Sequence, residues 1–385
     1  MKRRDFLKLT ALGTAALATG LSRLDGAAPA SGTAADAFPP VPVYRTLGRT
    51  KLQVTIVGFG AMLTPEPEVI GAGIDMGINY LDTARVYMNG RNEEIVGKAL
   101  TGRRDKVILA TKTKGKSVTP EAIIDDVETS LASLKTDHID IIQLHNVTNA
   151  NRDRLLDRNV RAALAGLRKE GKVRFFGVTT HTDQADVINA VVDDPDKFFD
   201  TVLVAYNFQS PPELKTAIAR AASAGIGIIA MKTQMGGYQV PAGDTTTQHQ
   251  AALRWVLADT NVATTIPGMR DMAMLKEDLS VMGMKLSSAD IERLERYSKA
   301  VSGYYCRLCA RCEPTCPNRV AISVVNRSLM YAEGYGSLEL ARATYDGLDP
   351  EATARTCAGC PGCVATCAHG LDIASRMSAA RALLG

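Results

Sequence analysis

Short runs of aliphatic and β-branched residues alternate with amphipathic helical stretches along residues 44–285. The runs mostly lack polar alternation, which is typical of parallel strands that are covered on both faces. Eight of them are predicted as strands, at residues 54–57, 78–81, 107–111, 139–144, 173–178, 201–206, 226–231 and 262–266. Helical stripes predict helices between them, at residues 121–134, 154–169, 185–192, 212–224 and 248–258.

Eight strand–helix pairs within about 240 residues predict an α/β fold, a (β/α)8 TIM barrel over residues 44–300. An open, doubly wound sheet is the alternative. The first predicted strand is followed by Gly58-Phe59-Gly60-Ala61-Met62, which is not the G-x-G-x-x-G fingerprint of a dinucleotide-binding sheet. We therefore expect the barrel, whose chemistry would lie at the carboxyl ends of its strands.

Four polar residues fall at the carboxyl ends of three consecutive predicted strands or just after them. Asp82 ends the second strand, and Tyr87 follows five residues later. Lys112 ends the third strand, and His145 ends the fourth. Singly, each has an ordinary interpretation as a loop or strand-end residue. Together they predict proton transfer, because an ammonium beside a tyrosine lowers the pKa of the phenol and a carboxylate holds that ammonium in place.

These residues and their surroundings resemble the aldo-keto reductase family over residues 43–285. The supporting motifs are Tyr44-Arg45-Thr46-Leu47-Gly48, Gly58-Phe59-Gly60, Asp82-Thr83-Ala84 and Ile139-Asp140-Ile141-Ile142-Gln143-Leu144-His145. The resemblance implies that Asp82, Tyr87, Lys112 and His145 form the family's catalytic tetrad. It also implies an NADP(H)-dependent oxidoreductase that interconverts a small-molecule aldehyde or ketone and an alcohol, with Tyr87 as general acid/base.

The resemblance further implies where the nicotinamide cofactor would bind. The expected cofactor-binding residues are Gly60, Ala61, Thr179, Met231, Gly268, Arg270, Glu277 and Asp278. Several positions depart from the family's pattern: Thr180 replaces a carboxamide, and Met231 stands where an aromatic ring often stacks on nicotinamide. His181 either lines this pocket or lies in a surface loop. Two alternatives stay open, that NADPH binds despite these changes or that the hydride donor has been changed or lost.

All eight cysteines lie in the last eighty residues, in two copies of one spacing. The copies are Cys306-x2-Cys309-x2-Cys312-x3-Cys316 and Cys357-x2-Cys360-x2-Cys363-x3-Cys367. This spacing resembles the runs that hold two [4Fe–4S] clusters in bacterial ferredoxins. Four disulfides or a zinc site are the alternatives. However, cysteines three residues apart are poor disulfide geometry, and zinc does not need the third and fourth cysteine of each run.

Residues 301–385 are predicted as a small α-helical ferredoxin-like domain, with helices around 324–331, 338–345 and 372–384. The pattern is similar to a domain appended to some aldo-keto reductases. That similarity implies an exchange of the fourth ligands, so that Cys367 completes the first cluster and Cys316 the second. The clusters would exchange electrons with a redox protein partner, or they would be structural. Because clusters pass single electrons and nicotinamide passes a hydride, a flavin stays open as a mediator.

The N-terminus begins with Lys2-Arg3-Arg4-Asp5-Phe6-Leu7-Lys8 and an apolar stretch, typical of a twin-arginine signal rather than of a first helix or a surface tail. We predict a signal peptide over residues 1–30, a linker over residues 31–43, and export of the folded protein to the periplasm by the twin-arginine machinery. The chain's net charge is +4, and residues 1–30 carry +3 of it. The nearly neutral remainder predicts no nucleic-acid binding. A non-catalytic electron-transfer protein on a retained barrel is the alternative function.

Overall fold

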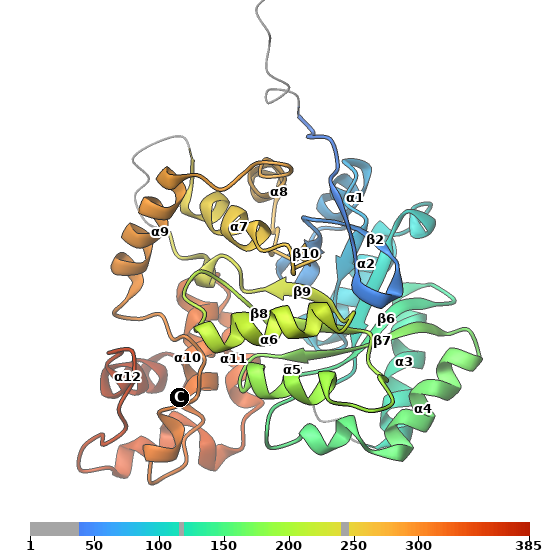
Figure 1. Ribbon diagram of the computed structural model, residues 1–385. Helices are drawn as coiled ribbons and strands as arrows, with labels where there is room; N and C mark the ends of the chain where they lie inside the picture. The colour runs from blue at the N-terminus through green and yellow to red at the C-terminus, as the bar shows by residue number, and fades with distance from the viewer. Residues whose placement is uncertain (1–37, 115–118, 240–245) are drawn as a thin grey trace, which may run out of the picture. The chain divides into compact units, whose positions relative to one another are not determined.

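Eight parallel strands form a barrel in the computed structural model, which describes residues 38–114, 119–239 and 246–385 (Figure 1). The predicted signal peptide and residues 31–37 of the predicted linker lie outside the described residues. The barrel strands are β3 (Phe59–Gly60), β4 (Tyr80–Asp82), β5 (Ile108–Lys112), β6 (Ile139–Leu144), β7 (Val173–Thr180), β8 (Thr201–Ala205), β9 (Gly227–Met231) and β10 (Thr264–Thr265).

The strands pair in chain order from β3 to β10, each parallel to its neighbour. Parallel bridges from Val57 to Thr265 and from Gly60 to Gly268 join the two ends of the sheet. The amide of Gly58 donates to the carbonyl of Thr265 at 2.8 Å across this seam. Because the sheet closes on itself, the predicted (β/α)8 barrel is confirmed.

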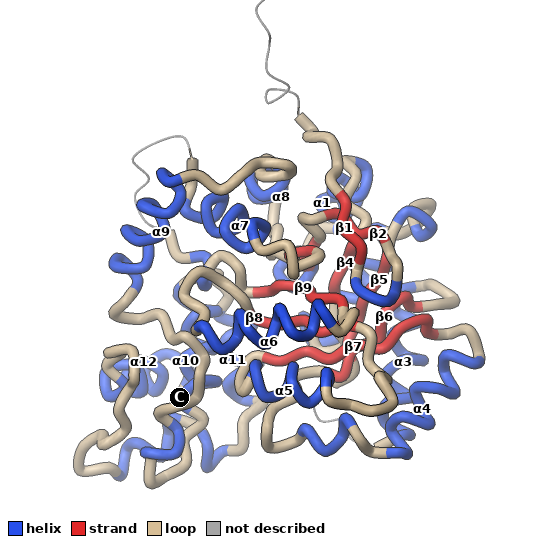
Figure 2. Tube along the Cα trace, viewed as in Figure 1, coloured by secondary structure: helices blue, strands red, loops and turns tan. Residues whose placement is uncertain are grey.

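Helices follow the strands and lie along the outside of the barrel, as α5 and α6 do beside β7 and β8 (Figure 2). These helices are α1 (Pro67–Asp75), α2 (Arg91–Ala99), α3 (Pro120–Leu134), α4 (Arg158–Lys169), α5 (Gln184–Val192), α6 (Pro212–Ser223), α7 (Gln248–Ala258), α8 (Met272–Leu279) and α9 (Ser288–Val301). Side chains of Thr119, Asp157 and Thr247 cap α3, α4 and α7, which satisfies amides that have no partner inside the helix.

The first barrel strand begins later than the sequence pattern predicts. Residues 53–55 form β2 (Gln53–Thr55), which pairs antiparallel with β1 (Tyr44–Thr46) outside the barrel sheet. Leu47 and Val54 from this hairpin pack with the barrel-interior residues Ile141 and Leu203. The predicted strand at 54–57 is therefore divided: Val54 belongs to the hairpin, whereas Val57 bridges Thr265 at the seam of the barrel. Val54 is buried in the barrel interior, and Ile56 and Val57 are buried in the main core.

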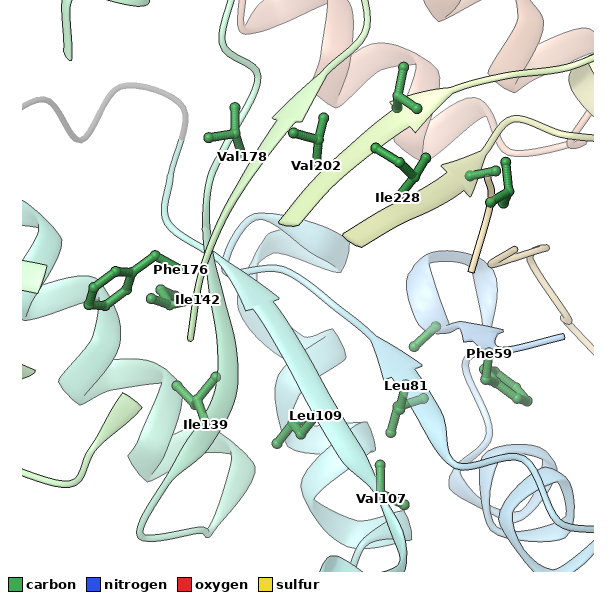
Figure 3. Packing of buried hydrophobic residues seen from close by; sticks show 14 of the residues in the cluster. Phe59, Leu81, Val107, Leu109, Ile139, Ile142, Phe176, Val178, Val202 and Ile228 are labelled. Atoms are coloured by element: carbon green, nitrogen blue, oxygen red, sulfur yellow. The ribbon is translucent and has the colours of Figure 1, made fainter. Parts of the chain in front are cut away.

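The main core lies between the strands and their helices. Figure 3 shows side chains on successive strands, including Phe59, Leu81, Leu109 and Phe176, and all four are fully or almost fully buried. A second set of strand residues fills the barrel interior. Strands that are buried on both faces need apolar residues at successive positions, which explains why the sequence shows continuous runs.

Residues 301–385, here called the C-terminal module, add α10 (Ile322–Glu333), α11 (Leu338–Asp346) and α12 (Ile373–Leu384). Their buried cluster also contains Met235, Tyr238 and Tyr297 of the barrel, and residues Phe38–Gly385 form one compact unit. Figure 1 shows α10 and α11 on the side towards which β8 and β9 point. The division into domains at residue 300 stays a prediction. Within the described residues, no helix has the length and apolar character needed to span a membrane.

Candidate active site

A buried ion pair lies at the carboxyl ends of β4 and β5. Asp82 ends β4 and Lys112 ends β5, and each side chain is almost completely buried. The Lys112 ammonium pairs with the Asp82 carboxylate and also donates to the carbonyl of Thr83 at 2.7 Å. The second carboxylate oxygen accepts from Nε2 of Gln143 at 2.9 Å. A buried charge needs such partners, so the pair fixes the position of the Lys112 ammonium.

Tyr87 and His145 stand next to this pair. The Lys112 ammonium lies 4.8 Å from the centre of the Tyr87 ring. The rings of Tyr87 and His145 are 6.3 Å apart and nearly perpendicular. The structure therefore brings together all four residues of the predicted tetrad, from the ends of β4, β5 and β6 and the loop after β4.

The pKa of Tyr87 differs from the lowered value that the sequence predicts. Burial, followed by the charges of Asp82 and Tyr331, raises the pKa of Tyr87 well above its usual value. The net lowering expected from Lys112 is not seen, because burial is the largest cause and Asp82 already pairs with the Lys112 charge. Burial and the charges of Lys112 and Arg327 lower the pKa of His145 to about 3, so this imidazole is neutral near pH 7.

A cavity of about 210 Å³ leads from Asp82 and Tyr87 towards the loop after β10. Five of the eight predicted cofactor residues line it, namely Gly60, Met231, Gly268, Arg270 and Glu277. Arg270 is exposed and its guanidinium donates to the carbonyl of Tyr335 at 3.0 Å. The cavity and its cationic rim agree with the position expected for the cofactor.

The other three predicted cofactor residues do not line this cavity. Ala61 is fully buried, and the hydroxyl of Thr179 accepts from the amide of Asn146 at 2.8 Å. Asp278 is buried and accepts from Nε2 of Gln234 at 2.6 Å. The amides of Ala273 and Met274 in the first turn of α8 donate to the side chain of Asp271, so these two amides already have a partner.

Sequence reasoning missed three contributors to this end of the barrel. Gln143 lies two residues before His145, and its polar side chain in an apolar strand was a usable signal. Lys232 follows β9, and its ammonium donates to the hydroxyl of Tyr331 on α10 at 3.0 Å. The same ammonium lies 4.7 Å from the Tyr331 ring centre and 5.5 Å from that of Tyr335. No local signal reveals this pairing, since the two partners are 99 residues apart.

The eight cysteines are all free thiols, and they form two groups. Burial raises the pKa of Cys306 to about 12, and the thiols of Cys312, Cys309 and Cys367 act in the same direction. Burial also raises the pKa of Cys357, and the thiols of Cys360, Cys316 and Cys363 raise it further. Because such effects need short distances, each group combines three cysteines of one run with the fourth of the other.

The two groups of thiols differ from a site for a single metal ion. Within the described residues, no three His, Cys, Asp or Glu side chains converge as the ligands of a single metal ion. The group of Cys316, Cys357, Cys360 and Cys363 lines a cavity of about 160 Å³. Backbone amides of Leu308 and His369 donate to sulfur atoms of the other group. Such hydrogen bonds are typical of iron–sulfur sites.

A further cavity of about 200 Å³ lies between the barrel and the first cysteine run. Its lining includes Asn207 from the loop after β8, Tyr305 and Cys309. The amide of Asn207 donates to the hydroxyl of Tyr305 at 3.0 Å. Lys232 borders this cavity and also the cavity that contains Tyr87. One side chain thus separates the space beside the cysteines from the space beside the tetrad.

Comparison with known proteins agrees with the barrel and its site. Residues 68–249 match the family model described as "Aldo/keto reductase family". An uncharacterized oxidoreductase of Bacillus subtilis, YqkF, is 38% identical over 151 residues, which cover 35% of this chain and 48% of that protein. The methylglyoxal reductase YeaE of Escherichia coli is 27% identical over 254 residues, with 62% and 86% covered.

The fold comparison extends over a larger part of the barrel. The holo form of the aldo-keto reductase AKR11C1 from Bacillus halodurans superposes with a TM-score of 0.55 at 25% identity, covering 66% of this chain and 96% of that one. The chain spans about half the length of the first curated relatives that it matches. Residues 68–249 are therefore similar to the aldo/keto reductase family, and the superposition extends the similarity in fold to a larger part of the barrel.

Proposed function

We propose that this chain is an oxidoreductase that interconverts a carbonyl compound and an alcohol, with Tyr87 as general acid/base. The observation that carries the proposal is the constellation of Tyr87 and His145 beside the buried Lys112–Asp82 pair, at a cavity in the carboxyl end of the barrel. The relatives named above include a protein named methylglyoxal reductase.

The residues divide the reaction between them as follows. The hydroxyl of Tyr87 donates a proton to the carbonyl oxygen as that oxygen gains negative charge, which leaves a phenolate. The Lys112 ammonium, held by Asp82, lies 4.8 Å from the centre of this ring and offsets part of the cost of the new negative charge, although burial keeps the pKa of Tyr87 raised. Neutral His145 donates a hydrogen bond to the same substrate oxygen and adds no competing charge. In the reverse direction the phenolate accepts the proton of the alcohol.

NADP(H) is the proposed source or acceptor of the hydride. Gly60, Met231 and Gly268 line the cavity next to Tyr87 and leave room for a flat ring, and a methionine sulfur packs well on such a ring. Arg270 and, further along, Glu277 would hold the other end of the cofactor. When bound, the nicotinamide supplies the hydride to the carbonyl carbon.

Replacing Tyr87 tests this function. We expect Tyr87→Phe to lower the rate of NADPH-dependent benzaldehyde reduction about 10²–10⁴-fold, because the proton donor is lost while the ring remains. NADPH consumption measures the rate. Tyr44→Phe is the matched control, since Tyr44 lies in the hairpin outside the barrel sheet and is about half exposed. Activity of Tyr87→Phe within a few-fold of the unmodified protein would show that the tetrad is not the acid/base.

Electron transfer by two [4Fe–4S] clusters is a second proposed function, carried by the C-terminal module. Its support is the grouping of the thiols into two sets of four, one of which lines a cavity, with backbone amides that donate to sulfur in the other. Cys306, Cys309, Cys312 and Cys367 would hold one cluster, and Cys357, Cys360, Cys363 and Cys316 the other. Bound clusters supply one-electron steps, and a redox protein is the proposed partner. Export to the periplasm by the twin-arginine route remains part of this proposal.

A further inference from the structure

Two cations meet at the junction of the barrel and the C-terminal module. Lys232 follows β9, and Arg327 lies on α10. Both side chains are half-buried. Within the described parts of the chain, neither forms an ion pair with a carboxylate, whereas Lys112 pairs with Asp82 and Arg376 of α12 pairs with Glu333. Half-buried cations without an opposite charge are costly, and a bound anion would offset that cost.

The influence of both cations reaches the candidate active site. Burial acts first on His181, and then the charges of Arg327 and Lys232 further lower its pKa well below the usual value. The charge of Arg327 also acts to lower the pKa of Tyr87 and the pKa of His145. Burial opposes a lowered pKa at Tyr331, yet the charges of Lys232 and Arg327 lower the pKa of this tyrosine. The charges of Lys232 and Arg327 therefore both act on side chains at this end of the barrel.

Unused hydrogen-bonding atoms accompany this potential. His181 at the end of β7 is 7% exposed, and its Nδ1 atom has no hydrogen-bond partner among the described residues. Nε of Arg327 is buried and equally without a partner in the described chain. Arg327 and Tyr331 are four residues apart on α10, so they lie on one face of the helix. Lys232 lines the cavity that also contains Tyr87. Lys232 thus lines the space beside Tyr87, and Arg327 lies on the same face of α10 as Tyr331, the hydrogen-bond partner of Lys232.

From this arrangement we infer that the substrate carries a carboxylate, which Lys232 and Arg327 bind while Tyr87 donates to the reacting carbonyl. The substrate class is an aldehyde acid or keto acid, and the C-terminal module, through Arg327, takes part in selecting it. The hydroxyl of Tyr331, which accepts from Lys232, would hold that ammonium in position for the carboxylate. This inference rests on the proposed carbonyl–alcohol activity and specifies its substrate.

Paired substrates test the inference directly. 4-Carboxybenzaldehyde and benzaldehyde differ only by the carboxylate, and 4-oxobutanoate and butanal are a second pair of that kind. We expect the full chain to prefer the carboxylate member of each pair in kcat/KM. Arg327→Met and Lys232→Met should each lower this preference about 10–100-fold, the range for a lost charged hydrogen bond. Lys285→Met removes an exposed charge between α8 and α9 and should leave the preference unchanged.

Two results would overturn the inference while the proposed function stands. One is a preference that survives both substitutions. The other is an equal loss for both members of a pair with a weaker NADPH dissociation constant, which would mean that these cations bind the cofactor's phosphates. If the unmodified protein reduces none of the four aldehydes, the proposed function fails instead. Calorimetric titration with benzoate then decides separately: binding that is lost in Arg327→Met supports the carboxylate site, and no binding by the unmodified protein rejects it.

Discussion

His145 and Tyr87 show how the surroundings of a residue set its charge. Both side chains lie beside cations, yet they respond differently: the pKa of the imidazole falls and the pKa of the phenol rises. Burial is the largest cause in each case, because it disfavours the charged form of either group. The consequence is a site in which the proton donor is fully protonated and the neighbouring hydrogen-bond donor is neutral over the ordinary pH range.

A flat pH profile is expected for carbonyl reduction. With its pKa lowered to about 3 from the usual value of about 6.5, His145 stays neutral as the pH falls through 6.5. Tyr87 keeps its proton as the pH rises, since its pKa lies above the usual value. We therefore expect kcat/KM for benzaldehyde to vary little between about pH 5 and 8. A decline centred near 6.5 that is absent in His145→Asn would contradict the neutral imidazole.

At the scale of single residues, the sequence predicted the positions of those side chains that depend only on where a strand ends. Asp82, Lys112 and His145 could be placed because each ends a recognisable strand, and parallel strands end at the same rim. The pairing of Lys232 with Tyr331 could not, since it depends on how α10 packs against the barrel. Thr179 and Asp278 do not line the cavity, and their side chains accept hydrogen bonds from Asn146 and Gln234; a pattern of residue types does not reveal such contacts.

At the scale of elements, α10 meets the loop after β9 through two glycines. A Cβ atom on Gly334 would lie 2.1 Å from the carbonyl oxygen of Gly236, which is far inside van der Waals contact. Gly236 itself has a φ of +86° and would clash with Met330 if it carried a side chain. This backbone contact holds α10, and thus Tyr331 and Arg327, at the open end of the barrel.

Gly334→Ala should therefore weaken the packing of α10. We expect the free energy of unfolding to fall by about 1–3 kcal/mol, the usual cost of an overpacked contact, as measured by urea denaturation of the full chain. Gly303→Ala is the matched control, because a Cβ atom there would meet nothing within 4 Å. Equal denaturation midpoints for the two variants would show that the contact is not tight.

The limits of pattern reading for elements are visible at β3. This strand has only two residues, Phe59 and Gly60, too few to form an apolar run of their own. The longer run before it begins in the hairpin and ends at Val57, which bridges Thr265 at the barrel seam. The apolar run therefore showed that this region is buried, but it did not show to which sheet each residue belongs. Hairpin strands and barrel strands bury the same kinds of residue.

At the scale of the whole molecule, the cysteine grouping makes the C-terminal module one interdependent unit. Cys316 neighbours the group of Cys357 although it is the fourth cysteine of the first run, and Cys367 of the second run neighbours the group of Cys306. The resemblance to ferredoxins implied this exchange of fourth ligands. Spacing alone left it undecided, because a run of four cysteines can equally hold one cluster by itself.

Double substitutions distinguish these arrangements. Cys316→Ser with Cys357→Ser should damage one proposed cluster and leave about half of the iron, since both thiols belong to one group. Cys316→Ser with Cys306→Ser should damage both clusters. Iron and sulfide analysis after anaerobic purification of the full chain gives the answer. The opposite pattern would assign each run its own cluster, and an unmodified protein without iron would reject the clusters altogether.

Lys232 forms a wall shared by the cavity beside Tyr87 and the cavity beside Cys309. A charge that changes on one side is therefore felt on the other through one ammonium. Thermodynamic reciprocity requires this effect to have the same size in both directions. If reduction at the first cysteine group tightens nucleotide binding by some factor, then bound nucleotide must favour that reduction by the same factor. Midpoint potential and nucleotide affinity would then be two measures of a single coupling energy.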